Sequence, residues 1–149
     1  MDEIEVEVSV GDGVTPPVQP ERVEAAVRHV LAAEGVEAAE ISVALVGDDE
    51  IASLNQGYLQ HEGPTDVISF ALHEAGDPPL GDIYVGVDQA ARQAAEFGAT
   101  PAEEVLRLAV HGTLHVLGYD HPADAGRTES EMFARQEALL RGFLGGARE

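Results

Sequence analysis

The chain has 149 residues with 44% hydrophobic side chains, which favours one globular domain, residues 1–149, and excludes an intrinsically disordered chain. No segment approaches the roughly 20 apolar residues that cross a bilayer, and the acidic start Met1–Glu3 is unlike the basic start of a signal peptide. We therefore expect a cytoplasmic protein with no membrane partner. Because the chain has no cysteine, any metal must be held by His, Asp or Glu.

The charge is strongly negative. Eight basic residues, all of them arginine, stand against 28 acidic ones and give a formal net charge of −20. A general nucleic-acid-binding surface carries basic patches instead, so this composition excludes that class. We interpret the acidic residues as a solvated coat that keeps the protein soluble through self-repulsion.

Hydrophobic periodicity and turn residues predict the element order β-α-β-α-β-β-α-α-α. The strands are predicted at Ile4–Val10, Ile41–Val46, Val67–Leu72 and Ile83–Val87. The helices are predicted from Pro20 to a stop at Gly35, over Asp48–Tyr58, from a cap at Asp88 to Phe97, from a capping box at Thr100 to Leu117, and from a second capping box at Thr128 to Phe143. This order predicts an α+β fold, with a small mixed sheet of about four strands packed with about five helices. The adjacent third and fourth strands suggest an antiparallel pair.

Two of these helices have a clear apolar face. In the first, the residues at helical spacing are Val23, Ala26, Val27, Val30 and Leu31. In the last, the side chains that we expect to pack inward are Met132, Phe133, Leu139, Leu140 and Phe143.

Three histidines carry the strongest chemical signal. His111 and His115 lie one turn apart on one face of a predicted helix, and His121 follows after a glycine break. Gly118 can adopt positive φ, so it can end the helix and turn His121 back toward the other two. Three imidazoles are the ligand set of a catalytic zinc site whose fourth position stays open. The pattern predicts one zinc ion per chain at a metalloprotease-like site.

One position separates this pattern from the zinc proteases. Their extended motif has the same histidine spacing, but its glutamate base is replaced here by Gly112. The sequence therefore favours metal-assisted hydrolysis and disfavours peptide cleavage by the usual route. Asp120 is the nearest carboxylate in sequence, and Asp66 and Asp82, near strand ends, are further candidates for a base or for a partner of the ligands.

The segment His111–His121 has the pattern His-Gly-x-Leu-His-x-x-Gly-Tyr-Asp-His and resembles the signature of the YbeY family of bacterial endoribonucleases, the rRNA maturation factors. The Leu-Asn-x-x-Tyr pattern from Leu54, followed by Pro-Thr-Asp-Val-Ile-Ser-Phe from Pro64, resembles the central motif of that family. Leu80–Ile83 resembles its next strand, and Met132–Glu137 resembles its last helix. The resemblance covers the chain from about residue 41 onward.

This resemblance implies a metal-dependent, single-strand-specific endoribonuclease that acts in 16S rRNA 3′-end maturation and in ribosome quality control. It implies zinc held by His111, His115 and His121. The implied partners are rRNA and the small ribosomal subunit, together with ribosomal proteins and a ribosome-assembly GTPase. We expect catalytic roles for His111, His115 and Asp120, and substrate contacts from Asp66, Tyr58 and Arg107.

The chain departs from the family at one position. The family usually carries an arginine after the tyrosine, and this position is Leu59 here. A leucine cannot pair with a phosphate or an oxyanion, so an arginine from elsewhere, such as Arg107 or Arg127, would have to supply that contact. Tyr58, Tyr84 and Tyr119 are candidates to stack on unpaired bases, although burial in a core is the commoner use of tyrosine.

Two other interpretations stay open on the sequence alone. In one, the protein is a zinc-dependent hydrolase of another substrate. In the other, it is a non-catalytic ribosome-assembly protein whose metal site is structural. A structural zinc site is closed by a fourth protein ligand, whereas a catalytic site keeps that position for water. The spacing of the histidines indicates three ligands.

Overall fold

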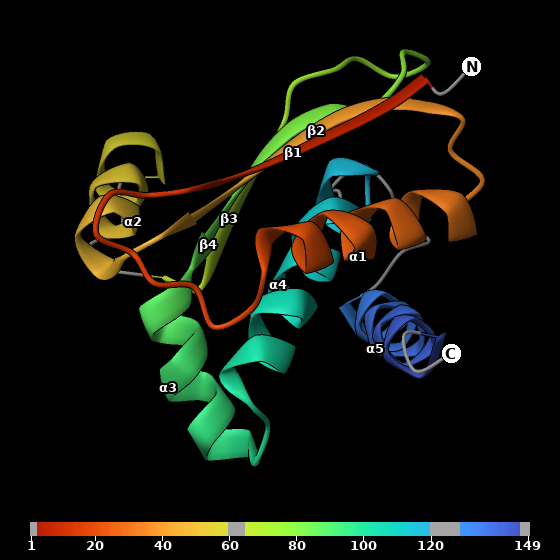
Figure 1. The fold of residues 1–149 in the computed structure, drawn as a ribbon. Helices are drawn as coiled ribbons and strands as arrows, with labels where there is room; N and C mark the ends of the chain where they lie inside the picture. The colour runs from red at the N-terminus through yellow and green to blue at the C-terminus, as the bar shows by residue number, and fades with distance from the viewer. Residues whose placement is uncertain (1–2, 60–64, 120–128, 147–149) are drawn as a thin grey trace.

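Four strands form one mixed sheet in the order β1-β2-β4-β3 (Figure 1). In the computed structural model, which describes residues 3–59, 65–119 and 129–146, the strands are β1 (Glu3–Val10), β2 (Ala38–Val46), β3 (Val67–Ala71) and β4 (Leu80–Gly86). β2 pairs in parallel with β1 and β4, and β3 pairs antiparallel with β4. The predicted mixed sheet and its antiparallel pair are confirmed.

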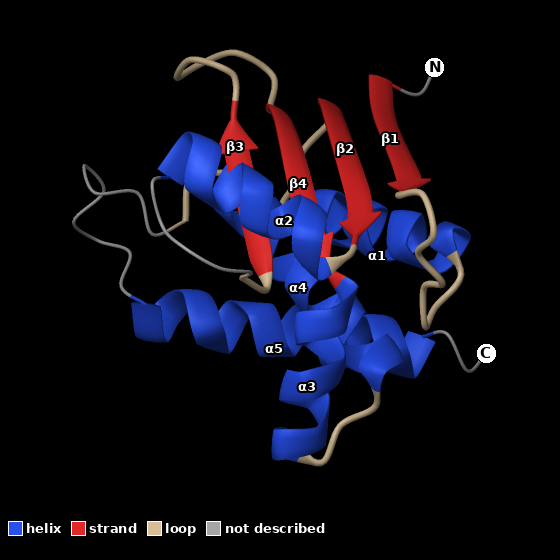
Figure 2. Ribbon diagram, turned by 90° about the vertical axis from the view of Figure 1, so that its left-hand side faces the viewer, coloured by secondary structure: helices blue, strands red, loops and turns tan. Residues whose placement is uncertain are grey.

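The helices cover the two faces of this sheet unequally. They are α1 (Pro20–Ala33), α2 (Asp48–Leu54), which continues as a π-helical turn η1 (Asn55–Leu59), α3 (Val87–Phe97), α4 (Pro101–Val116) and α5 (Glu129–Gly146). α1 and α4 lie behind the sheet in Figure 2 and α2 lies in front of it, while α3 and α5 pack against α4. None of the helices in the described ranges is long and apolar enough to cross a membrane.

Local signals in the sequence account for the best-predicted elements. The five apolar residues of the first helix are all fully buried in α1, and Gly35 follows the helix with φ of 73°. At the start of α4, the Thr100 side chain accepts a hydrogen bond from the Glu103 backbone N–H at 3.1 Å, as the capping box predicts. The second predicted capping box begins at Thr128, which lies outside the described residues.

Besides the start of β2, which lies at Ala38 rather than Ile41, three predictions differ from the structure. β4 begins at Leu80 rather than Ile83, because Gly81 pairs with Ile41 of β2 and Ala71 of β3. The Val116 side chain of α4 lies over Gly81, where a Cβ would be 2.7 Å from both Val116 methyls. Asp88 does not cap its own helix, because α3 begins at Val87. Its Oδ2 instead accepts from the Asp48 backbone N–H at 3.0 Å, at the start of α2.

Phe133 is the third difference. Met132, Leu139, Leu140 and Phe143 of α5 are buried as predicted, but the Phe133 side chain is 61% exposed. This residue lies about 100° around the helix from Met132, at the margin of the buried face. The side chain therefore faces outward rather than into the core.

α4 lies unusually close to the sheet along one line. A Cβ at Gly112 would lie 2.7 Å from Cγ2 of Ile83, a residue of β4 that is only 1% exposed. A residue with any side chain would force the helix away from the strand at this point. Gly112 is therefore needed for packing, and the position has no room for the glutamate of a protease motif.

We expect Gly112→Ala to lower the free energy of unfolding by about 1–3 kcal/mol, because the added methyl overpacks a buried contact. Gly145→Ala in α5 is the matched control, since a Cβ there meets nothing within 4 Å. Stability of the control should be unchanged or slightly higher, because alanine favours the helix. Chemical denaturation of both variants measures the difference, and equal stabilities would contradict the packing role of Gly112.

Candidate active site

A cleft of about 810 Å³ lies along one stripe of α4. From α4 the stripe contributes Glu104, Arg107, Leu108 and His111, which recur every three or four residues. The rest of the lining comes from α3, α5 and the segments beside them, namely Asp66, Gln93, Phe97, Ala99, Met132, Phe133, Gln136 and Glu137. The volume falls in the upper part of the range of about 300–1,000 Å³ that is typical of ligand sites.

His111 and His115 meet at one end of this stripe. Their Nε2 atoms are 3.0 Å apart and their ring centroids are 4.5 Å apart. Two nitrogen ligands of a tetrahedral zinc ion, each at about 2.0–2.1 Å from the metal, lie about 3.3 Å from each other. The two imidazoles are therefore arranged as neighbouring ligands of one ion would be.

Gln136 sets the orientation and the tautomer of the His111 ring. The His111 Nδ1 lies 2.6 Å from Gln136 Oε1, and the Gln136 amide nitrogen donates to Glu137 Oε2 at 3.0 Å. Since the amide oxygen faces the ring, Nδ1 donates, and in the neutral ring Nε2 then carries the lone pair that can bind a metal. Gln136 is only 5% exposed. Gln136 was not predicted to have a role, because the sequence singled it out only as part of the helix that resembles the last helix of the family.

A chain of hydrogen bonds continues from Gln136 along the whole cleft. Glu137 accepts from Arg107 Nε at 2.8 Å, and Arg107 Nη1 donates to Glu104 Oε1 at 2.6 Å. The Gln93 amide nitrogen then lies 3.3 Å from both Glu104 Oε2 and Asp66 Oδ2. The chain links α3, α4 and α5 to the start of β3, so it holds the walls of the cleft at fixed positions.

The ionic groups in this chain stabilise each other. Burial by itself disfavours the charge on Glu137, but hydrogen bonds from Arg107 and Gln136 outweigh burial and hold the pKa of this carboxyl below its ordinary value. Burial also disfavours the charge on Arg107, whose pKa is nevertheless raised by the hydrogen bonds to Glu137 and Glu104. Two of the five N–H donors of Arg107 are thus used inside the protein.

Glu34, at the end of α1, forms hydrogen bonds to the residue just after α4 and to α5. One carboxylate oxygen accepts from the Tyr119 hydroxyl at 2.7 Å, and the other accepts from Arg135 Nε at 2.7 Å. Gly118, just before the tyrosine, has φ of 102°, as the sequence predicts for the turn after the helix. These contacts fix the position of Tyr119, just after α4.

The structure brings some of the predicted site residues together and not others. His111, Asp66 and Arg107 line the cleft, and His115 contacts His111. Asp120 and His121 lie outside the described residues, as does the side chain of Tyr58. Within the part of the chain that the structure describes, no group of three His, Asp or Glu converges on one point.

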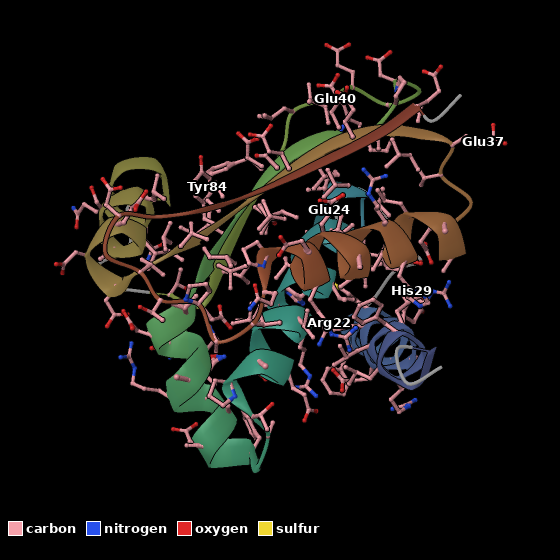
Figure 3. All side chains as sticks on the ribbon, in the orientation of Figure 1. Arg22, Glu24, His29, Glu37, Glu40 and Tyr84 are labelled. Atoms are coloured by element: carbon pink, nitrogen blue, oxygen red, sulfur yellow. The ribbon has the colours of Figure 1, made fainter. Side chains whose placement is uncertain are left out.

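The suggestion that Asp82 reaches the site is wrong. Its neighbours Gly81 and Ile83 face α4, so the side chain of Asp82 points to the opposite face of the sheet, where Ser42 Oγ donates to its Oδ1 at 2.7 Å. Glu40 and Tyr84, at alternate positions of β2 and β4, lie on this outer face too (Figure 3). Alternation along the strand therefore separates Asp82 from the cleft.

Two further histidines have structural contacts. The His29 ring, on the side of α1 that faces α5 in Figure 3, packs against Phe143 with a centroid distance of 5.7 Å. His73 Nδ1 accepts from the Leu80 backbone N–H at 3.1 Å across the β3–β4 connection. These two histidines lie apart from the cleft and serve packing and turn geometry.

We expect Arg107→Met to lower the free energy of unfolding by about 3–5 kcal/mol, because it leaves the buried Glu104 without its ionic partner. Arg92→Met is the matched control: Arg92 pairs with Asp48 at 2.9 Å, but its side chain is 52% exposed. Removing such a surface pair should cost at most about 1 kcal/mol.

The pH dependence tests the same interaction. Because the pKa of Glu137 is lowered from 4.5 in the folded state, its stabilisation is complete above pH 4.5 and is lost as the pH falls through the folded value. The stability difference between wild type and Arg107→Met should therefore shrink in acid. A difference that is small at neutral pH, or independent of pH, would contradict this role of the ion pair.

Comparisons with known proteins agree on one family. The family model described as endoribonuclease YbeY matches residues 14–144. An endoribonuclease YbeY from Moorella thermoacetica is 50% identical over 123 residues, which cover 74% of this chain and 78% of the relative. One from Chloroflexus aurantiacus is 41% identical over 157 residues, which cover 97% of both chains.

A solved structure supports the fold as well. The solution structure of TM1509 from Thermotoga maritima matches with a TM-score of 0.67 and 30% sequence identity, and the match covers 97% of this chain and 91% of that one. The α+β fold predicted from the sequence is thus shared with it. With this match, the family model and the relatives over most of its length, the chain belongs to the YbeY family of endoribonucleases, which are phosphodiester hydrolases.

Proposed function

We propose that residues 1–149 form one domain that cleaves single-stranded RNA with the help of one zinc ion held by His111, His115 and His121. The YbeY family is a family of metalloenzymes. The observation that carries the proposal is the His111–His115 pair, whose Nε2 atoms converge at 3.0 Å at the end of a cleft. Neutral imidazoles of this kind suit zinc, and the hydrogen bond from His111 to Gln136 is the outer contact that a ligating histidine usually has.

The residues around the metal take separate roles. When bound, zinc supplies a Lewis acid that polarises a phosphoryl oxygen and makes water more acidic. Asp120, the carboxylate nearest in sequence to the histidines, is our candidate for the general base that takes the proton from the attacking water. Asp66 and Arg107 contact the RNA from the cleft, and Tyr58 stacks on a base. The N–H groups of Arg107 that do not bond to Glu104 and Glu137 are the ones that would reach a phosphate.

The tight packing at Gly112 separates this function from that of a zinc protease. A protease of the same spacing needs a glutamate there, and Ile83 leaves no room for one. The open cleft beside His111 also favours a catalytic over a closed structural metal site.

We place the enzyme in 16S rRNA 3′-end maturation and ribosome quality control, in the cytoplasm, with rRNA and the small ribosomal subunit as partners. Ribosomal proteins and a ribosome-assembly GTPase are further partners in this proposal. With a formal net charge of −20 the protein gains little from counterion release on RNA. A ribosomal partner that delivers the RNA would offset this weak intrinsic affinity.

We expect His115→Ala to lose the metal and the ability to cut a single-stranded fragment of the rRNA 3′ end, because two imidazoles hold zinc poorly. Elemental analysis gives the metal content, and cleavage is followed at low and high salt with zinc-loaded protein. His29→Gln is the control, since His29 packs against Phe143 outside the cleft, and it should keep both metal and activity. Normal metal content in His115→Ala would refute the three-histidine site, and cleavage by the metal-free variant would refute the metal-dependent mechanism.

We expect Leu59→Arg to raise the rate of RNA cleavage, because a guanidinium at this position can pair with a phosphate or an oxyanion. The single-turnover rate on the same RNA fragment measures the effect. Leu59→Gln, which adds a polar but uncharged side chain, is the control and should change the rate less. An unchanged rate in Leu59→Arg would mean that another residue already supplies this contact.

A further inference from the structure

The two most exposed large hydrophobic side chains of the described residues line the same cleft. Phe97, at the end of α3, is 75% exposed, and Phe133 on α5 is 61% exposed. The other large hydrophobic side chains that are exposed in this part of the chain do not line the cleft, and they are Val10, Leu72 and Leu80. Two exposed aromatic rings on one concave surface indicate a binding site.

The rings lie toward opposite ends of the cleft. Phe97 follows Gln93 by one helical turn, and Gln93 is hydrogen-bonded to Glu104 near the start of α4. Phe133 precedes Gln136 by one turn, and Gln136 is hydrogen-bonded to His111. Glu104 and His111 are seven residues apart, or about 10 Å along α4. A chain-like ligand that passes His111 would therefore meet both rings.

The charge of the cleft favours bases over phosphates as the groups that bind between the rings. Its charged lining consists of three carboxylates and one guanidinium, and that guanidinium already bonds to two of the carboxylates. Apart from the N–H groups of Arg107 that do not bond to these carboxylates, such a lining offers a phosphate backbone little attraction. A nucleobase is uncharged and stacks on an aromatic face without regard to the surrounding charge.

The tyrosines that the sequence offered for stacking are used elsewhere where the structure describes their side chains. The Tyr84 ring packs edge to face against Phe70 on the outer face of the sheet, with centroids 6.1 Å apart. The Tyr119 hydroxyl donates to Glu34. The described aromatic side chains that line the cleft are thus phenylalanines and not Tyr84 or Tyr119.

We propose that Phe97 and Phe133 stack on unpaired bases of the RNA substrate and so make the enzyme select single strands. In a duplex both faces of each base are covered by neighbouring bases, so a paired strand cannot stack on these rings. The inference rests on the proposed function, because it takes the RNA to lie in the cleft beside His111. The two rings are specificity-determining residues and not part of the chemistry.

The test uses zinc-loaded wild type, Phe97→Ala, Phe133→Ala and the matched variants Phe97→Leu and Phe133→Leu, which keep apolar bulk but lose the ring. Leu72→Ala is the control for loss of an exposed apolar side chain outside the cleft, since Leu72 is 54% exposed. We expect each alanine variant to raise the KM for a single-stranded RNA about tenfold, the effect of losing one base–aromatic stack, with kcat unchanged. The leucine variants should have a KM close to that of the alanine variants, and Leu72→Ala should have the KM of the wild type.

A second readout reports stacking directly. Oligonucleotides with 2-aminopurine at single positions lose fluorescence when that base stacks, and stopped-flow mixing records the loss before any cleavage. Wild type should quench the probe, both alanine variants should quench it less, and the difference should persist at high salt because stacking does not depend on phosphate contacts. Quenching by a wild-type protein that does not cut the RNA would support the stacking and contradict the proposed function.

Three results would overturn the inference. One is an unchanged KM and unchanged quenching in both alanine variants. Another is full recovery of KM by leucine, which would show that apolar bulk and not the ring is needed. The third is a change of oligomeric state in Phe97→Ala or Phe133→Ala, measured by sedimentation, with RNA affinity unaffected, which would make this surface a contact between copies of the chain.

Discussion

The close contact between α4 and β4 decides where the α4 side chains of the cleft point. Gly112 lies against Ile83, and Val116 lies over Gly81, so one line of the helix is held directly on the sheet. At about 100° per residue, a stripe a quarter turn away faces neither the sheet nor the core. That stripe carries Glu104, Arg107 and His111, which line the cleft, and His115, which contacts His111. The two glycines thus position the histidines by allowing the helix to approach.

The hydrogen-bonded side chains in the cleft are stable only when each of them has its partners. Glu104 is 4% exposed and Gln136 is 5% exposed, and such groups are costly when they lack hydrogen-bond partners. No buried side-chain nitrogen or oxygen in the described residues lacks a partner. Arg107 is the central member because it bridges α4 and α5 through two carboxylates. The same network that fixes His111 therefore also joins the helices that form the cleft.

The parts of the fold set by local patterns could be predicted from the sequence. The buried face of α1, the cap at Thr100 and the histidine pair follow from spacing within one helix. The differences arise where a distant segment decides the outcome. Gly81 pairs with Ile41 and Ala71 in the sheet and leaves room for Val116 of α4, and the Asp88 carboxylate caps α2 across 40 residues of sequence.

The same limit applies to the site. Gln136 meets His111 across 25 residues, and Glu137 meets Arg107 across 30, so no local pattern indicates either contact. Phe133 sits at the margin of an amphipathic face, where periodicity cannot tell a core residue from one that borders a cleft.

The structure of the cleft explains how a strongly acidic protein can act on RNA. A nuclease that gripped RNA through its phosphates would need many basic side chains, and this chain has eight arginines against 28 acidic residues. In the cleft, Arg107 forms ion pairs with Glu104 and Glu137, so its charge mainly stabilises these two carboxylates. Affinity must then come from groups that do not depend on net charge. In our proposal the two exposed phenylalanine rings of the cleft supply such affinity, and RNA with unpaired bases is the form that can stack on them.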